Sequence, residues 1–215
     1  GVLVVCVNKA TKAIQFLMSD TKVYRATLSL GKSTDTYDAS GKILEEKEVG
    51  QISKAQVIDV YGVLNHVLLA KHFKTLMMYI GKDVQVIDQV TGQKRSACLA
   101  DESHCAIIIS YSGQTREMVE VAEIYHKRNI PFISITCMAE NSISRLADVH
   151  LYLSSREMLH IKIGDFASTT SLKYLFDILY AGVFSYDYKK NLETKIVVAS
   201  YVDDRQSEDE YINEK

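Results

Sequence analysis

Residues 107–115 read Ile-Ile-Ile-Ser-Tyr-Ser-Gly-Gln-Thr. Three β-branched residues favour a buried strand, and a turn rich in hydroxyl groups follows them at once. An amphipathic helical pattern comes next, with apolar residues at Met118, Val121, Ala122 and Tyr125. The N–H groups of a helix's first turn point outward, and the helix dipole adds partial positive charge there. This order of strand, turn and helix therefore predicts a phosphate-binding loop.

The side chains of the turn can add further contacts to a phosphate. Ser110, Ser112 and Thr115 carry hydroxyl donors, and Gly113 allows the backbone to come close to a ligand. The ordinary alternative is a polar turn that only caps a helix, and for an isolated turn of this kind we would prefer it.

The chain after residue 50 alternates between strand and helix patterns. Strands are predicted over residues 57–61, 84–87, 106–109, 132–135 and 149–153. Helices are predicted over residues 64–80, 91–99, 143–147 and 166–186 and after Thr115, and Gly81 is placed to end the first of them. This alternation predicts the α/β class: a five-stranded parallel, doubly wound sheet flanked by helices, with a β-rich segment at the N-terminus.

Open parallel sheets bind ligands beyond the carboxyl ends of their strands. Four segments leave such ends here, namely residues 62–66, 110–115, 136–142 and those from 154 onward. Hydroxyl side chains recur in the last three segments. We therefore expect one crevice that suits a polyhydroxy, phosphorylated ligand.

Composition excludes several other classes. Hydrophobic residues make up 47% of the 215 residues and charged residues 24%, which is typical of a soluble globular protein. The formal net charge of -2 gives no sign of a nucleic-acid surface, and no apolar run approaches the roughly 20 residues that span a bilayer. The four cysteines form no C-x-x-C pair, so we expect reduced thiols, a cytoplasmic location and no metal or cofactor.

Residues 1–49 have a different, β-rich pattern, with strands predicted over residues 2–7, 23–30 and 43–49 and a short helix over 10–18. The sequences KVYR at residues 22–25 and TDTYDASG at 34–41 resemble the TruB-type tRNA pseudouridine synthases. In that family the aspartate nucleophile precedes the matching segment, and Tyr24 corresponds to a tyrosine near the target base. We therefore expect a structural piece with no pseudouridine synthase activity and no direct nucleic-acid binding.

A second resemblance covers residues 50–192. The sequences VYG at 60–62, ISYSGQT at 109–115, ISIT at 133–136, LAD at 146–148 and LFDILY at 175–180 resemble the SIS, or sugar isomerase, domain, above all that of RpiR-type transcriptional regulators. The resemblance implies an α/β sandwich that forms homodimers or higher homo-oligomers and binds a sugar phosphate.

The resemblance also implies which residues bind the ligand. Ser110, Ser112 and Thr115 match the phosphate-binding hydroxyls, and Tyr111, Gly113 and Gln114 share their loop. Further contacts are expected from Asn65 and from the hydroxyl cluster Ser168, Thr169 and Thr170. Many relatives have a serine where this chain has Leu64, so one contact to the ligand is expected to be missing.

Three functions remain open at this stage. We favour sugar-phosphate binding without catalysis, as in a metabolite-sensing regulator without its DNA-binding domain. An aldose–ketose isomerase would need an acid or base at the sugar's reactive end, for which Glu157, His160 and His66 are the weak candidates. The third reading is a structural chimera that binds nothing.

The domain division expected is 1–49, a TruB-like fragment; 50–192, a SIS domain; and 193–215, a C-terminal strand with an acidic tail. Two family fragments in one chain suggest an artificial fusion near Gly50. The helix over 166–186 is apolar on much of its circumference, which suits both a core and a homodimer face. Its apolar residues include Leu172, Leu175, Phe176, Leu179 and Phe184.

Overall fold

The computed structural model describes residues 32–34, 42–46, 55–153, 157–158, 161 and 163–202. By its internal contacts the chain divides into residues 1–30 and 31–215, and all described residues belong to the second unit. The strands and the helix predicted before residue 31 lie outside the described residues. In the first described part, β1 (Lys32–Thr34) pairs antiparallel with β2 (Ile43–Glu46), so a strand begins at Ile43 as predicted.

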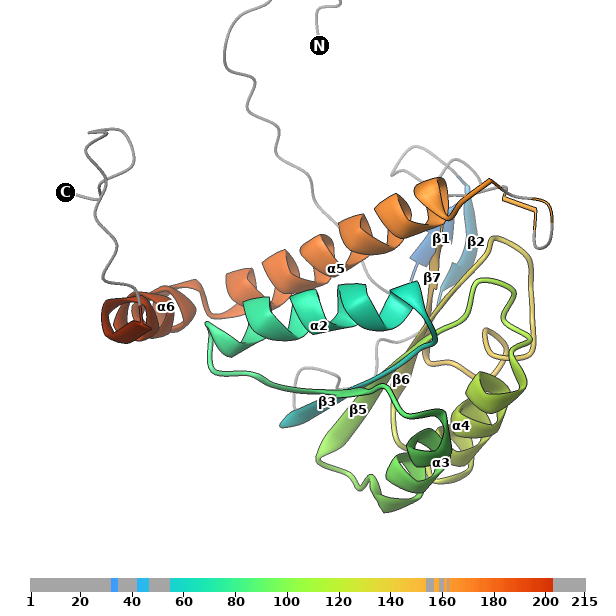
Figure 1. The fold of residues 1–215 in the computed structure, drawn as a ribbon, viewed down its shortest axis with the longest axis horizontal. Helices are drawn as coiled ribbons and strands as arrows, with labels where there is room; N and C mark the ends of the chain where they lie inside the picture. Colours follow the sequence, from blue (N-terminus) through green and yellow to red (C-terminus); the bar gives the residue numbers. More distant parts are fainter. Residues whose placement is uncertain are drawn as a thin grey trace, which may run out of the picture. The chain divides into compact units, whose positions relative to one another are not determined.

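A five-stranded parallel sheet forms the centre of the fold (Figure 1). Its strands are β3 (Val57–Tyr61), β4 (Asp83–Ile87), β5 (His104–Ile109), β6 (Phe132–Thr136) and β7 (Val149–Tyr152). The spatial order is β4-β3-β5-β6-β7, and each neighbouring pair is parallel. The predicted fold class is confirmed, with strand bounds within two residues of those expected.

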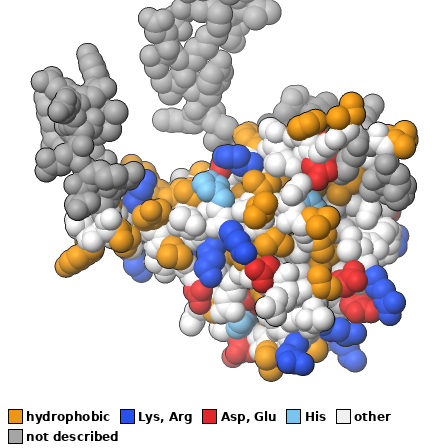
Figure 2. Space-filling model, viewed as in Figure 1, with side chains coloured by type: hydrophobic (Ala, Val, Ile, Leu, Met, Phe, Trp, Pro, Cys, Tyr) orange, Lys and Arg blue, Asp and Glu red, His pale blue; other side chains and the backbone are white. Residues whose placement is uncertain are grey.

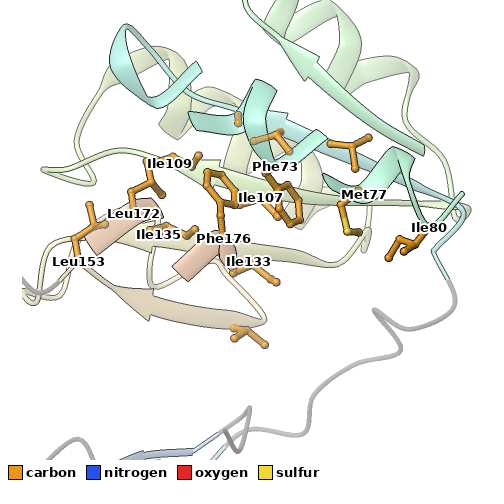
Figure 3. Close-up of a cluster of buried hydrophobic side chains, with 14 residues drawn as sticks. Phe73, Met77, Ile80, Ile107, Ile109, Ile133, Ile135, Leu153, Leu172 and Phe176 are labelled. Atoms are coloured by element: carbon orange, nitrogen blue, oxygen red, sulfur yellow. The ribbon is translucent and has the colours of Figure 1, made fainter. Parts of the chain in front are cut away.

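Two helices cover each face of the sheet (Figure 1). α2 (Asn65–Met78) and α5 (Phe166–Tyr186) pack on one face, where the rings of Phe73 and Phe176 stack with centroids 4.7 Å apart (Figure 3). α3 (Val90–Leu99) and α4 (Arg116–Lys127) pack on the other. The four apolar residues that predicted α4 are all buried against the sheet.

The prediction of a C-terminal strand is wrong, because α6 (Tyr188–Val202) occupies these residues. The β-branched run at 196–198 favours a strand locally, but α6 follows α5 after one residue. Asn191 is buried at the junction, and its side-chain amide donates to the carbonyl oxygens of Val183 and Phe184, at 3.0 and 3.1 Å. The last turn of α5 thus receives two hydrogen bonds from the first turn of α6.

The helix predicted over residues 143–147 is also wrong, since residues 142–146 form turns. In this segment the backbone N–H groups of Asn141 and Ser144 each donate to the side chain of the other residue. The Asn141 N–H donates to the Ser144 hydroxyl at 2.9 Å, and the Ser144 N–H donates to the Asn141 amide oxygen at 3.0 Å. Such side-chain bonds to the backbone compete with helix formation.

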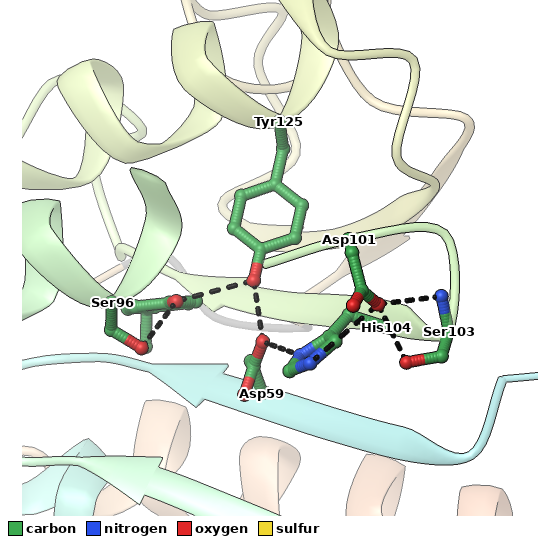
Figure 4. A network of polar contacts seen from close by, with 7 residues as sticks. Asp59, Ser96, Asp101, Ser103, His104 and Tyr125 are labelled. Carbon is green, nitrogen blue, oxygen red and sulfur yellow. Dashed lines mark hydrogen bonds and ion pairs between the residues drawn. The ribbon is translucent and has the colours of Figure 1, made fainter. Parts of the chain in front are cut away.

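A buried polar network joins the sheet to α4 near the amino ends of the strands (Figure 4). The carboxyl group of Asp59, 1% exposed, accepts from the Tyr125 hydroxyl at 2.6 Å and lies 2.7 Å from Nδ1 of His104. Tyr125 also contacts the hydroxyl of Tyr61 at 3.2 Å. Burial raises the pKa of Tyr61 to about 12 and raises that of Tyr125 as well, so both phenols keep their protons at neutral pH.

The network predicts the effect of replacing Tyr125 by phenylalanine. Tyr125→Phe removes a donor from a buried carboxyl group, which should lower the free energy of unfolding by about 1–3 kcal/mol. Tyr79→Phe is the control, because Tyr79 at the end of α2 is exposed, and its effect should stay within about 0.5 kcal/mol. Urea denaturation measures both; equal losses in the two variants would contradict the assignment.

Candidate phosphate-binding site

The candidate site lies at the carboxyl ends of β3 and β5. The chain leaves β3 toward β4 on one side and later returns to β5 on the other, so this is the point where the strand order reverses. The two strand ends are close: a Cβ atom built on the buried Gly62 would lie 3.7 Å from Cβ of Ile109. Parallel open sheets bind their ligands at such switch points.

The loop after β5 is held in shape by its own hydroxyl groups. Ser110 is buried, and its Oγ accepts from the Gly113 N–H at 3.1 Å and pairs with the Thr115 hydroxyl at 2.8 Å. The Ser112 Oγ accepts from the Gln114 N–H at 3.2 Å. The loop therefore has a defined conformation in which Ser110 acts mainly as an internal brace, while Ser112 and Thr115 are half-buried and Gln114 is exposed.

Gly113 fixes this loop against the loop after β6. It has a positive φ of 64°, and a Cβ atom placed on it would lie 2.0 Å from Oδ1 of Asn141. Asn141 cannot easily move, because its amide nitrogen donates to the Thr136 hydroxyl at 2.7 Å and to the Ala139 carbonyl at 2.8 Å. Only glycine combines this backbone conformation with such a close approach.

The N-terminus of α4 is directed to this loop. Thr115 is the N-cap residue in extended conformation, yet its hydroxyl pairs with Ser110 instead of capping, and no described side chain caps the helix. The N–H groups of the first turn of α4 lack partners within the helix, as at any helix start. The start of α4 thus offers backbone donors and the positive end of a helix dipole, and two half-buried hydroxyls precede it directly, which is the combination that an anion site needs.

The N-terminus of α5 borders the same edge, and Glu157 caps it. Oε1 of Glu157 accepts from the N–H groups of Ala167 and Ser168, at 2.7 and 3.0 Å, and Oε2 accepts from the Ser168 hydroxyl at 2.6 Å. The backbone oxygen of Glu157 accepts from the Tyr111 hydroxyl at 2.8 Å, which connects this cap to the 110–115 loop.

The start of α2 forms a further border. The Asn65 amide donates to Oδ2 of Asp165, just before α5, at 2.9 Å. Leu64, the residue before α2, has φ 53° and ψ -123° with its side chain 86% exposed. A non-glycine residue at positive φ is strained and such positions cluster at functional sites.

The structure brings most of the predicted ligand-binding residues to one edge of the sheet. Two of them have other uses: the Ser168 hydroxyl is bound to Glu157, and the Thr170 hydroxyl donates to the Phe166 carbonyl within α5 at 2.8 Å. His66 is half-buried in the first turn of α2, and His160 lies outside the described residues.

Sequence reasoning missed the residues that support the loops. Asn141 is one, and Gln93 is another: its buried amide donates to the carbonyl oxygens of Gly62 and Ile87, at 2.9 and 3.1 Å, and so joins the ends of β3 and β4. The position of Asn141 shortly after a strand end was the only available signal. Over the described ranges no cluster of His, Cys, Asp or Glu could hold a metal ion, and no helix is long and apolar enough to cross a membrane.

Comparison with known proteins identifies the class. The sequence model of the SIS domain matches residues 51–175, more than half of the chain, so the chain belongs to the SIS domain family. A second model, the N-terminal domain of TruB family pseudouridylate synthases, matches residues 1–67. Both predicted resemblances are therefore confirmed, and the two matches overlap over residues 51–67.

Curated relatives follow the same division. The tRNA pseudouridine synthase B of Clostridium perfringens is 48% identical over 59 residues, which are 27% of this chain and 20% of the synthase. The uncharacterized HTH-type transcriptional regulator YbbH of Bacillus subtilis is 26% identical over 155 residues, 72% of this chain and 55% of the regulator. The chain thus spans a fifth of the one relative and about half of the other.

Solved structures share the fold. The NanR protein of Vibrio vulnificus, complexed with ManNAc-6P, superposes with a TM-score of 0.66 and 22% identity over 73% of this chain and 59% of NanR. The sugar isomerase domain of an RpiR transcription factor from Sphaerobacter thermophilus gives 0.58 and 17%, over 69% and 81%. A putative phosphosugar isomerase involved in capsule formation from Bacteroides fragilis gives 0.54 and 21%, over 68% and 78%.

The contact between Gly113 and Asn141 predicts the effect of a methyl group. Gly113→Ala places Cβ inside the Asn141 side chain and an alanine at positive φ, which should lower the free energy of unfolding by about 1–3 kcal/mol. Gly182→Ala on α5 is the matched control, since nothing lies within 4 Å of a Cβ there, and helix propensity favours alanine. Thermal denaturation compares them; a Gly113→Ala variant as stable as the parent would refute the close packing.

Proposed function

We propose that the chain binds a phosphorylated sugar without catalysis, as the ligand-sensing domain of a metabolite-responsive transcriptional regulator. The observation that carries this is the loop at 110–115, braced by its own hydroxyls at the switch point, in front of an α4 that no described side chain caps. The structural relative NanR, complexed with ManNAc-6P, supports a sugar phosphate as the ligand class.

In the proposed complex the phosphate contacts the first-turn N–H groups of α4 and the hydroxyls of Ser112 and Thr115. Ser110 holds the loop rather than contacting the ligand, because it is 1% exposed. The sugar extends from there toward Asn65 and the start of α5. Tyr111 and Gln114 complete the border of the site, in keeping with the half-buried and exposed positions of their side chains.

A phosphosugar isomerase is the less favoured alternative. Its candidate base, Glu157, already accepts three hydrogen bonds at the N-terminus of α5, so proton abstraction from a sugar would compete with the cap. Structures described as putative phosphosugar isomerases share the fold, which keeps the alternative worth an assay.

Calorimetry with a panel of sugar phosphates tests the binding function. We expect Ser112→Ala to weaken binding of the best ligand by about tenfold or more, because a hydrogen bond to a charged group contributes about 1.5–3 kcal/mol. Ser200→Ala on α6 is the matched control and should bind like the parent, since its hydroxyl donates to the Val197 carbonyl far along the chain from the site.

Three outcomes would contradict the proposal. If no sugar phosphate gives a heat of binding, the protein does not bind this class of ligand. Turnover of any member of the panel, abolished in Glu157→Gln, would establish the isomerase instead. If Ser112→Ala binds the ligand as tightly as the parent protein, the phosphate does not bind at the 110–115 loop.

We propose further that the SIS domain begins near residue 50 and that residues 1–49 form a separate, TruB-like part of the chain. This division is supported by the two family matches, which meet at residues 51–67. The relation to pseudouridine synthases concerns a fifth of the synthase's length.

We also propose a homodimer that covers the outer side of α5 and α6. Leu172 and Phe176 are buried in the core and cannot serve this face, whereas other apolar side chains remain exposed on the helices (Figure 2). They include Tyr174 and Tyr186 on α5 and Ile196, Val197, Tyr201 and Val202 on α6.

The dimer can be tested with a charged pair on α6. The double substitution Ile196→Lys and Val197→Lys should convert the dimer to a monomer in analytical ultracentrifugation, because two ammonium groups would have to be desolvated in the interface. Leu99→Lys, at an apolar residue at the end of α3 that is more exposed than Ile196 and Val197, is the control and should remain dimeric. A monomeric parent protein would refute the dimer directly.

A further inference from the structure

The carboxylate of Glu157 lies at the N-terminus of α5, which is a place where an anionic ligand could otherwise bind. The first turn of α5 offers outward N–H groups at the positive end of a helix dipole. The carboxylate of Glu157 occupies it with three acceptor contacts of 2.6 to 3.0 Å, and Asp165, the N-cap residue, makes no side-chain cap there. The α5 terminus is therefore already supplied with an anion from the chain itself.

The backbone of Glu157 is bonded to the 110–115 loop. Tyr111 belongs to that loop, and its hydroxyl donates to the backbone oxygen of Glu157 at 2.8 Å. One tyrosine side chain thus connects the 110–115 loop with the residue that caps α5. Asp165 is joined to Asn65 at the start of α2, so a second carboxyl group stands on this side of the site.

We propose that Glu157 makes the site selective for sugar monophosphates whose far end carries hydroxyl or ammonium donors, and that it excludes ligands with a second negative charge there. This inference rests on the proposed function, because it places the phosphate at residues 110–115. It adds the chemistry of the opposite end of the ligand: phosphorylated sugar acids and bisphosphates are rejected.

The selectivity follows from the properties of a carboxylate. An ionised carboxylate accepts hydrogen bonds and donates none, and the three contacts to α5 show Glu157 in this role. Any contact that it makes with a ligand must therefore come from a hydroxyl or ammonium group of that ligand. A ligand carboxylate or phosphate at the same place offers no hydrogen and meets like charge.

Three ligands that share a phosphate test the inference: glucose 6-phosphate, glucosamine 6-phosphate and 6-phosphogluconate. The parent protein should bind 6-phosphogluconate about tenfold or more weakly than glucose 6-phosphate, and the amino sugar at least as tightly as glucose 6-phosphate. Glu157→Gln keeps an acceptor for the α5 N–H groups but removes the charge. In this variant 6-phosphogluconate should bind only about threefold or less more weakly than glucose 6-phosphate.

Two control variants separate charge from structure. Glu140→Gln removes a charge from an exposed residue at the same edge of the sheet, and it should leave the ranking of the three ligands unchanged. Ser168→Ala removes the hydroxyl that binds Oε2 but keeps the Glu157 charge, so discrimination against the acid should persist. If Glu157→Gln ranks the affinities of the three ligands as the parent protein does, Glu157 serves only as a helix cap and the inference is overturned.

Salt dependence in the parent protein provides a test that needs no variant to fold. Repulsion between charges is screened, so the difference between 6-phosphogluconate and glucose 6-phosphate should narrow from about 50 mM to about 500 mM salt, over which the Debye length falls roughly threefold. If the parent protein binds all three ligands equally, or if salt does not change the difference in affinity, the inference about Glu157 is overturned and the proposed function still stands. If none of the sugar phosphates binds, the proposed function falls, and this inference falls with it.

Discussion

The close approach of Gly113 to Asn141 is the constraint on which the carboxyl edge of this sheet depends. Hydrogen bonds to Thr136 and Ala139 fix Asn141 at the end of β6, and a glycine at positive φ is what fits against it. The loop after β5 can then close over Ser110 and lead straight into α4. A site built this way loses little conformational freedom when a ligand binds, which leaves more of the contact energy as affinity.

The opposite end of the sheet is held by a different kind of contact. Asp59 joins β3 to β5 through His104 and to α4 through Tyr125, all beneath the surface. Burial raises the pKa of Tyr61 and of Tyr125, so both phenols keep their protons and Tyr125 remains a donor to the carboxyl group of Asp59. Because α4 is anchored here at its far end, its N-terminus stays fixed relative to β5, where the proposed anion site lies. Stability at one edge thereby supports binding at the other.

The sequence predicted what is encoded locally and failed where distant contacts decide. Runs such as Ile107–Ile109 in β5 and the buried spacing of α4 carry their own signals, so the sheet and its helices were predictable. The strand expected after residue 193 had a local signal too, but Asn191 and the end of α5 impose a helix. No local pattern shows that Ser168 faces Glu157 or that Asn141 supports Gly113, because these pairs form only after the sheet has brought separate loops together.

The role of the Glu157 carboxylate bears on the choice between the two candidate functions, ligand sensing and catalysis. A general base must exchange a proton with its substrate, and each exchange would neutralise the carboxylate that caps α5. The cap would weaken at every turnover, at a helix whose Phe176 packs on α2 in the main core. A residue that remains charged throughout the binding cycle has no such conflict, and it can both hold α5 and accept hydrogen bonds from a sugar. The geometry of the cap therefore fits the proposed function, in which the ligand is bound and released unchanged.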